Sequence, residues 1–550
     1  MIRKIALAVA SASFLVACGG GGDINLAPTN IDNSVDNSTS GGTGGGTNPC
    51  AQYTDAGGTV VQGSFDGQNC TYTSGFVGVG NPLTVDLTIP FISGVHIFED
   101  SLFVGENVDS GQAPAEGAGP TLTIRAGNTL AFLDSQDYVL IHRGSQIVAN
   151  GSPTAPITFT AFSDAVLGTA GAEDVSLWGG IQINGNGITN NCTDDERAAN
   201  ACHVLTEGQP SNYGGSTNTE SSGSLQFTVL KHSGFEVAPG DELNGITFNA
   251  IGSGTTVANN EVYSTFDDGF EFFGGAVAVE KFAAVYVRDD SIDYSDGWVG
   301  SMTDALVIHS MGDGNRCIEA DNIGSGRSEG GESLDTVPTT NPTVTGLTCI
   351  PSGNDDGTHG DSEGVLLRLG ARSQISNMIV FGGYGETANG SSNECLEFDD
   401  GATRTAAQGG ETTITASIIA CATEPTKDDL PNGDTIAQFF TNTGAADYGF
   451  NVVDVTFDFD GDDTTADTTQ QQANVIETDP NNANVSILAA GDFRTAGYDA
   501  DADVTIVIDA AGNQIVFPGR LGAVSTDDDW TTGWTFGLNE SNRAQPLYFN

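Results

Sequence analysis

The chain of 550 residues is 38% hydrophobic, which is enough to bury a large core and argues against a disordered chain. Its formal net charge of −55 argues against a nucleic-acid partner, because 17 basic residues cannot neutralise a phosphate backbone. Asp outnumbers Glu about two to one, so the acidity either keeps the protein soluble or supplies loop ligands for divalent cations.

The first 17 residues predict a signal peptide. Arg3 and Lys4 precede an apolar run that is too short to span a bilayer, and the run ends in Leu15–Cys18. These last four residues resemble the lipobox of bacterial lipoproteins, which implies export, cleavage before Cys18 and a membrane anchor through lipid on Cys18. By the same resemblance, Gly19 after the cysteine favours the outer membrane. The alternative is an ordinary signal peptide that ends beside an incidental cysteine.

Residues 18–49 predict a flexible tether. They are rich in Gly, Asn, Ser and Thr and show no apolar period. The two ends of such a segment lie roughly 30 Å apart on average, which would hold the body clear of a lipid surface. Residues 50–120 are expected to form an N-terminal cap region.

Short strands dominate from Thr121 onward and predict an all-β body. A small residue, an apolar residue, a variable residue and usually another apolar one recur every 22 to 31 residues, or about twice that. The repeats begin at Gly245, Gly269, Ser291, Cys317, Gly364 and Cys395. Each continues into a second apolar stretch, so a coil holds about three short strands that bury their apolar side chains only by stacking. The sequence therefore predicts a parallel β-helix over residues 121–430, with irregular C-terminal coils and a cap over 431–550.

The nine cysteines divide into Cys18 and four neighbouring couples. An even number in an exported chain favours disulfides over thiol chemistry, and the couples do not form CxxC motifs. Cys317 and Cys395 occupy the same first-strand position of the repeat, while Cys349 and Cys421 lie late in the second apolar strand that follows. Spacing leaves the connectivity open, but the preferred pairs are Cys50–Cys70, Cys192–Cys202, Cys317–Cys349 and Cys395–Cys421.

Several motifs resemble one family. The matching pieces are "LTIRAGNTL", "VLIHRGSQIVANGSPTAPITFTA", "WGGIQINGNG", "LNGITFNAIGSGTTV", "DDGFEFFGG", "DDSIDYSDGW" and "LGAVSTDDDWTTGW". In combination they are similar to bacterial secreted proteins and lipoproteins with a right-handed parallel β-helix of the pectin-lyase type. The resemblance implies that fold and a surface location. It implies no settled activity, since the wider fold hosts polysaccharide lyases, hydrolases and adhesins.

The repeat places carboxylates on one face of the predicted first-strand sheet. Alternate residues of a strand face opposite sides, so if Phe270 and Phe272 point into the coil, Glu271 points out. The same register turns three further acids outward, with Leu366 interrupting the row: Asp293, Glu319 and Glu397. Unit charges about 4.8 Å apart repel by roughly 1 kcal/mol in water and roughly 3.5 kcal/mol at a dielectric of about 20. Such a row favours a bound cation or a raised pKa.

Aspartates in the turns before these strands add to the row. Carboxylate oxygens on stacked turns are good ligands for calcium. The predicted calcium ligands are Asp267, Asp268, Glu271, Asp289, Asp290, Asp293 and Glu319. The competing interpretation is that Asp suits turns because its side chain accepts backbone N–H bonds there. We expect no organic cofactor.

A catalytic role is the third interpretation of the same residues. Polysaccharide hydrolases on this fold use outward Asp pairs as general acid and base, and lyases combine calcium-binding acids with a Lys or Arg base. The candidate acids are Asp289, Asp290 and Asp293, and the candidate base is Arg316 or Arg368. The full motif set of either enzyme class is absent from the sequence.

The sequence favours an outer-membrane lipoprotein whose β-helix acts as a binding or adhesion module at the cell surface, for carbohydrate and assisted by calcium. The first alternative is a polysaccharide lyase or glycoside hydrolase, and the second is a structural partner of an outer-membrane transporter or assembly. The expected partners are the membrane, through Cys18, and a polysaccharide or surface protein. The four tryptophans are expected to pack turns rather than to stack on sugars: Trp178, Trp298, Trp530 and Trp534.

Overall fold

The computed structural model describes residues 48–208, 211–353, 357–383, 394–421, 425–448, 474–477, 488, 492–501, 503–508 and 514–549. Residues from Asn48 onward form one compact unit. The predicted signal peptide, the predicted lipidation at Cys18 and nearly all of the predicted tether lie outside the described residues.

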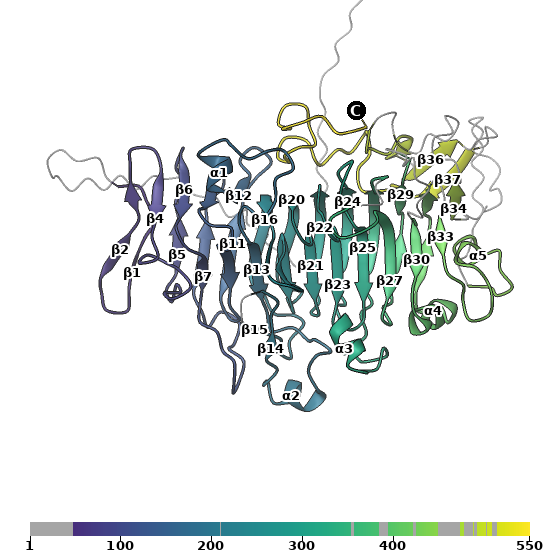
Figure 1. Cartoon of the computed structure of the whole chain (residues 1–550), viewed down its shortest axis with the longest axis horizontal. Helices are drawn as coiled ribbons and strands as arrows, with labels where there is room; N and C mark the ends of the chain where they lie inside the picture. Colours follow the sequence, from purple (N-terminus) through teal and green to yellow (C-terminus); the bar gives the residue numbers. More distant parts are fainter. Residues whose placement is uncertain are drawn as a thin grey trace, which may run out of the picture. The chain divides into compact units, whose positions relative to one another are not determined.

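Ten parallel strands, one from each coil, form the first sheet. Figure 1 shows them side by side along the body. Ile246, Phe270 and Ile292 lie opposite one another in adjacent strands, which confirms the register of the predicted repeat. In spatial order the strands are β7 (Leu102–Val104), β10 (Tyr138–Ile141), β13 (Gly180–Asn184), β19 (Ile246–Asn249), β21 (Phe270–Phe273), β23 (Ile292–Ser295), β25 (Arg316–Asp321), β27 (Glu363–Arg368), β30 (Leu396–Phe398) and β33 (Thr426–Lys427).

The other strands of the coils form a second sheet of 18 strands. Pairs of short strands in the outer coils correspond to single long strands in the middle ones, so that β11 and β12 both pair with β16. The strands are β3 (Ser64–Phe65), β4 (Cys70–Tyr72), β5 (Leu87–Ile89), β6 (Val95–Phe98), β8 (Thr121–Ile124), β9 (Thr129–Phe132), β11 (Gln146–Asn150), β12 (Ile157–Ala161), β16 (Gly223–Ser233), β20 (Thr256–Thr265), β22 (Ala278–Val285), β24 (Ser301–Ile308), β26 (Thr343–Ile350), β28 (Gln374–Ser376), β29 (Ile379–Phe381), β31 (Thr413–Thr415), β32 (Ile418–Ala420) and β34 (Val475–Glu477). Long parallel sheets of this kind are those of a parallel β-helix, and its right-handedness stays a prediction.

A left-handed residue turns each long strand through a corner. Asn259, Lys281 and Asp304 have φ values of 58°, 53° and 61° and occupy equivalent positions in successive coils. One residue in the left-handed region redirects a strand without ending it, and Asn and Asp tolerate that region better than most residues. The corner divides each long strand in two, which accounts for the three short strands per coil that the sequence predicts.

Apolar side chains fill the inside of the coils. Phe270 and Phe272 are fully buried, and the Phe272 ring stacks on Trp298 with 4.5 Å between centroids. Trp178 stacks on Phe132 in the same way at 4.8 Å. All four tryptophans are buried, so they pack the body as expected.

The structure contains the four predicted disulfides: Cys50–Cys70, Cys192–Cys202, Cys317–Cys349 and Cys395–Cys421. Such bonds form outside the cytoplasm, so they indicate an extracytoplasmic protein. Within the described ranges, none of the helices is both long and apolar enough to cross a membrane.

The remaining elements decorate the coils. Antiparallel pairs are formed by β1 (Gln52–Thr54) with β2 (Val60–Gln62), β14 (Val204–Leu205) with β15 (Asn212–Tyr213), and β17 (Phe235–Ala238) with β18 (Asp241–Leu243). A three-stranded antiparallel sheet contains β35 (Tyr498–Asp499), β36 (Val504–Ile508) and β37 (Gln514–Pro518). The helices are α1 (Phe162–Ala165), α2 (Asp194–Ala198), α3 (Ser325–Glu329), α4 (Gly401–Gln408) and α5 (Ile436–Thr441).

The two ends of the β-helix differ from the predicted boundaries. Parallel pairing starts before residue 121, since β4 pairs with β6 and β6 with β9. These early strands have only three or four residues, which is too short for a clear period. At the other end, Phe439 and Phe440 of α5 are buried in the interior core.

The C-terminal segment, which here means the described residues between Leu488 and Leu547, packs on the outer face of the second sheet. Phe493, Trp530 and Trp534 are buried in one cluster with outward-facing residues of that sheet such as Val229 and Leu306. In Figure 1 this segment, in yellow, runs along the upper edge of the body. The expected C-terminal cap is therefore only partly an end cap, because much of it protects a sheet face instead.

Candidate functional site

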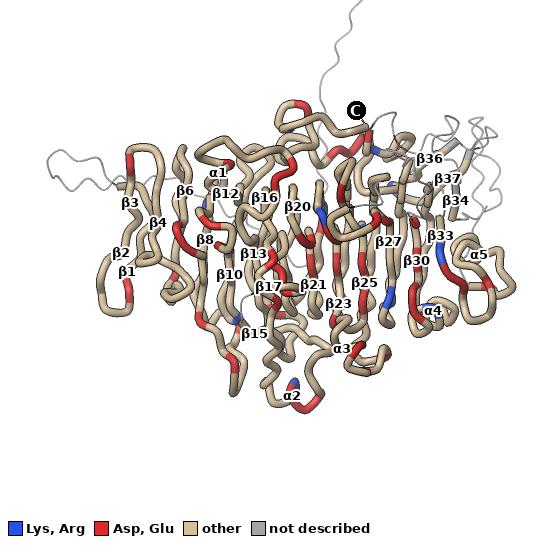
Figure 2. The backbone as a smooth tube through the Cα atoms, viewed as in Figure 1, with Lys and Arg blue, Asp and Glu red and all other residues tan. Residues whose placement is uncertain are grey.

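The predicted acidic row lies on the outer face of the first sheet. Register pairs Glu271 with Asp293, Asp293 with Glu319, Glu319 with Leu366 and Leu366 with Glu397. Figure 2 shows acidic residues, in red, gathered on the middle strands of this sheet. The row points out of the coil, but Glu271 and Glu319 are each only 5% exposed.

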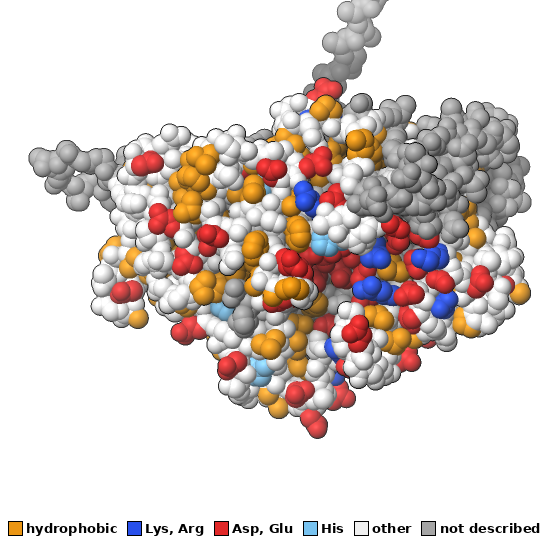
Figure 3. Space-filling model, in the orientation of Figure 1, with side chains coloured by type: hydrophobic (Ala, Val, Ile, Leu, Met, Phe, Trp, Pro, Cys, Tyr) orange, Lys and Arg blue, Asp and Glu red, His pale blue; other side chains and the backbone are white. Residues whose placement is uncertain are grey.

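Insertions between the strands cover the row. Asn244, which follows the β17–β18 hairpin, donates a side-chain hydrogen bond to Glu271. The loop that contains His359 reaches the acids from another side, where His359 Nδ1 lies 2.8 Å from Asp289 Oδ2. Figure 3 shows acidic side chains at the bottom of a hollow, with basic side chains beside it. The carboxylates are therefore held in a recess instead of on an open surface.

The turn aspartates link successive coils. The backbone N–H of Asp268 donates to Asn244 Oδ1, that of Asp290 to Asp268 Oδ1 and that of Arg316 to Asp290 Oδ1, at 3.1, 3.1 and 2.9 Å. The turn-forming interpretation therefore applies to one oxygen of Asp268 and one oxygen of Asp290. It does not account for the acids of the row itself, since Glu271 and Asp293 lie inside strands.

Burial and mutual repulsion disfavour the ionised form of these acids. Burial, followed by the neighbouring carboxylates, raises the pKa of four acids well above the usual range: Asp268, Glu271, Asp290 and Asp293. The same two causes raise the pKa of Asp267. Glu207, on an insertion beside Glu271, has its pKa raised by burial and by Glu242 to about 7. The recess holds more negative charge than it can easily keep without protons or a cation.

Buried acidic clusters here could bind metal ions. Each of the following groups offers oxygen or nitrogen atoms that lie within 4.8 Å of one another: Asp268, Glu271 and Asp293; Asp290, Asp293 and Glu319; Asp268, Asp289 and Asp290; and Asp267, Asp289 and His359. Asp293 belongs to two of these groups, and its buried Oδ1 accepts no hydrogen bond within the described ranges. The seven predicted calcium ligands all fall in these groups, whose mainly carboxylate composition suits a hard cation such as Ca²⁺.

Two arginines border the acids. Arg316 lies 2.9 Å from Glu319 and 3.2 Å from Glu363, and Arg368 pairs with Glu319 and with both oxygens of Asp321. Burial opposes the charge of both guanidinium groups, but the surrounding carboxylates raise the pKa of Arg316 and Arg368 above the usual value. Each arginine therefore keeps its proton, which argues against the predicted role as a catalytic base.

Comparison with a family model identifies the fold family of this chain. The model described as a pectate-lyase like beta helix domain matches residues 113–448, more than half of the chain. The chain belongs to this family. No curated protein and no solved structure matches the sequence significantly.

In this pectate-lyase-like β-helix, several site residues lie outside the repeat that predicts the acidic row. Glu207 and His359 come from insertions, whose sequences have no period that would align them with the strands. Asn244, in contrast, directly precedes Gly245 and occupies the same repeat position as Asp268 and Asp290, so it could have been found from the sequence. Asp321 lies at the end of β25, two residues after Glu319, and burial raises its pKa to about 7 even though Arg368 lowers it. The alternation that places Glu319 outward also places Asp321 outward, so this residue could have been found from the sequence.

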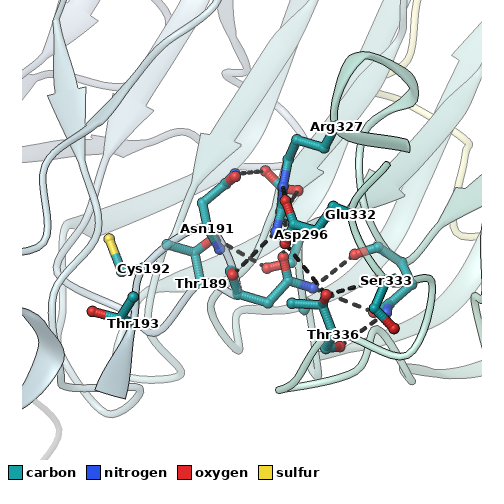
Figure 4. A network of polar contacts seen from close by, with 12 residues as sticks. Thr189, Asn191, Cys192, Thr193, Asp296, Arg327, Glu332, Ser333 and Thr336 are labelled. Atoms are coloured by element: carbon teal, nitrogen blue, oxygen red, sulfur yellow. Dashed lines mark hydrogen bonds and ion pairs between the residues drawn. The ribbon is translucent and has the colours of Figure 1, made fainter. Parts of the chain in front are cut away.

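An ion-pair network fixes one rim of the recess (Figure 4). Arg327 of α3 contacts Asp296 at 2.7 Å and donates two hydrogen bonds to Glu332, at 2.6 and 3.0 Å. Asn191, from the insertion after β13, also donates to Asp296. The network ties two insertions to the turn that follows β23, so the rim is built from distant parts of the sequence.

Proposed function

We propose that this β-helix is a cation-assisted polysaccharide-binding module, held at the outer membrane by lipid on Cys18. The recess on the first sheet is the binding site. The observation that carries the proposal is the row Glu271, Asp293 and Glu319, in which the two glutamates are buried and Asp293 is half-buried. Their oxygens fall into two groups that share Asp293.

Ca²⁺ is the cation that suits these ligands. It accepts several carboxylate oxygens in flexible geometry and leaves positions for oxygens of another molecule. A sugar hydroxyl or carboxylate would complete its coordination at the mouth of the recess. The overall charge of −55 would repel an acidic polysaccharide, so a bridging cation is needed for that class of ligand.

Binding is favoured over catalysis because the predicted bases are engaged. Arg316 and Arg368 each contact more than one carboxylate, and a guanidinium group with a raised pKa does not accept a proton. The candidate acids Asp289, Asp290 and Asp293 remain candidates for metal ligation in this proposal.

One observation favours the polysaccharide-cleaving alternative. His359 Nδ1 lies 2.8 Å from Asp289 Oδ2, next to Asp267. Burial lowers the pKa of His359, but its hydrogen bond to Asp289 and the nearby charges raise it overall. A carboxylate paired with a histidine beside a protonated carboxyl group is a general acid–base arrangement. If cleavage occurs, we expect His359→Gln to abolish it.

Calorimetric titration of Ca²⁺ into the metal-free protein tests the cation. We expect Asp293→Asn to weaken Ca²⁺ binding at least tenfold, and Asp399→Asn, at an exposed residue just after β30, to leave it unchanged. Equal affinity of wild type and Asp293→Asn would overturn the assignment of the site. Polygalacturonate, alginate and dextran are then compared with and without Ca²⁺. Retention that needs Ca²⁺, with no unsaturated or reducing ends formed, supports a binding module, and release of such ends supports a lyase or hydrolase.

The membrane anchor is tested separately. Lipid at Cys18 predicts that labelled palmitate is incorporated into the wild-type chain but not into Cys18→Ala, and that the wild-type chain fractionates with outer membranes. A soluble wild-type protein without label would leave the binding proposal standing but remove the anchor.

A further inference from the structure

A second recess lies on the second sheet, away from the acidic row of the first. It is a cavity of about 320 Å³ that opens to the surface and is lined by strands of the early coils, by α1 and by the C-terminal segment. This volume is at the lower end of the range for small-molecule sites. We propose that this cavity binds a single neutral sugar ring, independently of calcium.

The floor crosses successive coils and carries two adjacent threonines between valines. Val95 pairs with Thr129 and Thr129 with Thr158, and all three line the cavity. The hydroxyls of Thr129 and Thr158 have no hydrogen-bond partner in the described part of the chain. Hydroxyls spaced by one strand separation, about 4.8 Å, can each contact a different hydroxyl of one sugar ring.

The C-terminal segment supplies an aromatic wall. Trp534 and Phe536 line the cavity, and the Trp534 ring is anchored by its Nε1, which donates to the carbonyl of Trp530 at 2.7 Å. Glu261 Oε2 accepts the backbone N–H of Phe536 at 2.6 Å, which fixes this wall to the sheet. Of the two rings only Phe536 is partly exposed, so it is the one that can pack against the apolar face of a sugar ring while the sugar hydroxyls reach polar groups at the edge.

An unsatisfied acceptor points to a donor in the ligand. Asn542 lines the cavity, and its side-chain amide donates to the carbonyl of Thr535. Its buried Oδ1 has no hydrogen-bond partner in the residues that the structure describes. A buried acceptor without a partner is costly, so a ligand hydroxyl that donates to Asn542 Oδ1 would be favoured.

The charges at the cavity neutralise one another. Lys231 Nζ lies 2.6 Å from Asp164 Oδ2 and 4.3 Å from the centre of the Phe536 ring. Because this ion pair is internally balanced and the whole chain is strongly acidic, the cavity favours a neutral ligand over an anionic one.

Saturation-transfer NMR on the intact protein, with glucose, galactose, mannose and N-acetylglucosamine as separate probes, tests the site. We expect at least one of these sugars to bind, with the same affinity in Ca²⁺ and in a chelator. The double variant Thr129→Val/Thr158→Val keeps the shape but removes both hydroxyls, and it should weaken binding at least tenfold. Thr123→Val, in the same sheet but outside the cavity, is the matched control and should bind as wild type does.

The results expected for sugar binding in this cavity can be distinguished from those expected for Ca²⁺ binding in the acidic recess. Asp293→Asn should leave binding of the neutral sugar unchanged. Absence of binding for all four sugars would overturn the proposal, as would wild-type affinity in the Thr129→Val/Thr158→Val variant. Galacturonate that binds as tightly as the neutral sugars would overturn the preference for a neutral ligand. Asn542→Ser gives an independent check, because a shorter side chain should also weaken binding.

Discussion

The side chain of Asp268 accepts the backbone N–H of Asp290 from the next coil, at 3.1 Å. This bond connects the fold to the site, because the aspartate that holds one turn to the next also adds a buried carboxyl group beside Glu271 and Asp293. The recess thus combines a structural role for some carboxylate oxygens with an excess of charge that other groups must offset. The first two predictions follow from that excess.

Without added divalent cation, we expect the melting temperature to fall as the pH rises from about 5 to about 8. Acids whose pKa is raised by folding bind more protons in the folded state, so their contribution to stability is complete below the unfolded pKa of about 4. It is lost as the pH rises through the folded pKa, which is about 7 for Glu207 and Asp321. Each acid protonated only in the folded state changes the free energy of unfolding by about 1.4 kcal/mol per pH unit. Calorimetry in a chelating buffer measures the trend, and a rising melting temperature would contradict it.

Calcium should reverse this loss of stability. At a pH of about 8 the acids are deprotonated and ready to bind a cation, so added Ca²⁺ should raise the melting temperature. At a pH of about 5 protons compete for the same oxygens, and the increase should be smaller. Glu271→Gln removes one charge from the row while keeping a hydrogen-bond partner for Asn244, so it should reduce the effect of Ca²⁺. The same shift at both pH values would show that Ca²⁺ binds elsewhere.

Neighbouring residues of β21 should differ sharply in their contribution to stability. Phe272 is buried inside the coil and stacks on Trp298, so Phe272→Ala should lower the free energy of unfolding by about 3–5 kcal/mol. Glu271→Gln, on the other face of the same strand, should change it by no more than about 1 kcal/mol in a chelating buffer, and in the stabilising direction at a pH of about 8. Denaturant unfolding of both variants measures the difference. A large loss for Glu271→Gln would mean that the charged row itself stabilises the fold.

The outward row and its register could be predicted because the repeat depends on local alternation. Placing Phe270 and Phe272 in the core determines that Glu271 points out, and stacking carries the same result to Asp293 and Glu319. The burial of the row could not be predicted, because the insertions that cover it interrupt the repeat and carry no period. His359 illustrates this point, since it reaches Asp289 from a loop 70 residues further along the chain. The packing of the C-terminal segment on the second sheet could not be predicted either, because that segment does not follow the repeat.

The Cys317–Cys349 disulfide should contribute more stability than Cys192–Cys202. Cys317 lies on the first sheet and Cys349 on the second, and the bond closes a loop of 32 residues, whereas Cys192–Cys202 closes one of 10. By loop entropy, removing them should lower the free energy of unfolding by about 3.7 and about 2.7 kcal/mol respectively. Cys317→Ala/Cys349→Ala leaves small apolar side chains in the core, and Cys192→Ala/Cys202→Ala is the matched control. Denaturant midpoints under oxidising conditions compare the two variants. If the control were the less stable protein, loop closure would not govern these bonds, and the local role of Cys192–Cys202 in holding the insertion beside Asn191 would be the larger effect.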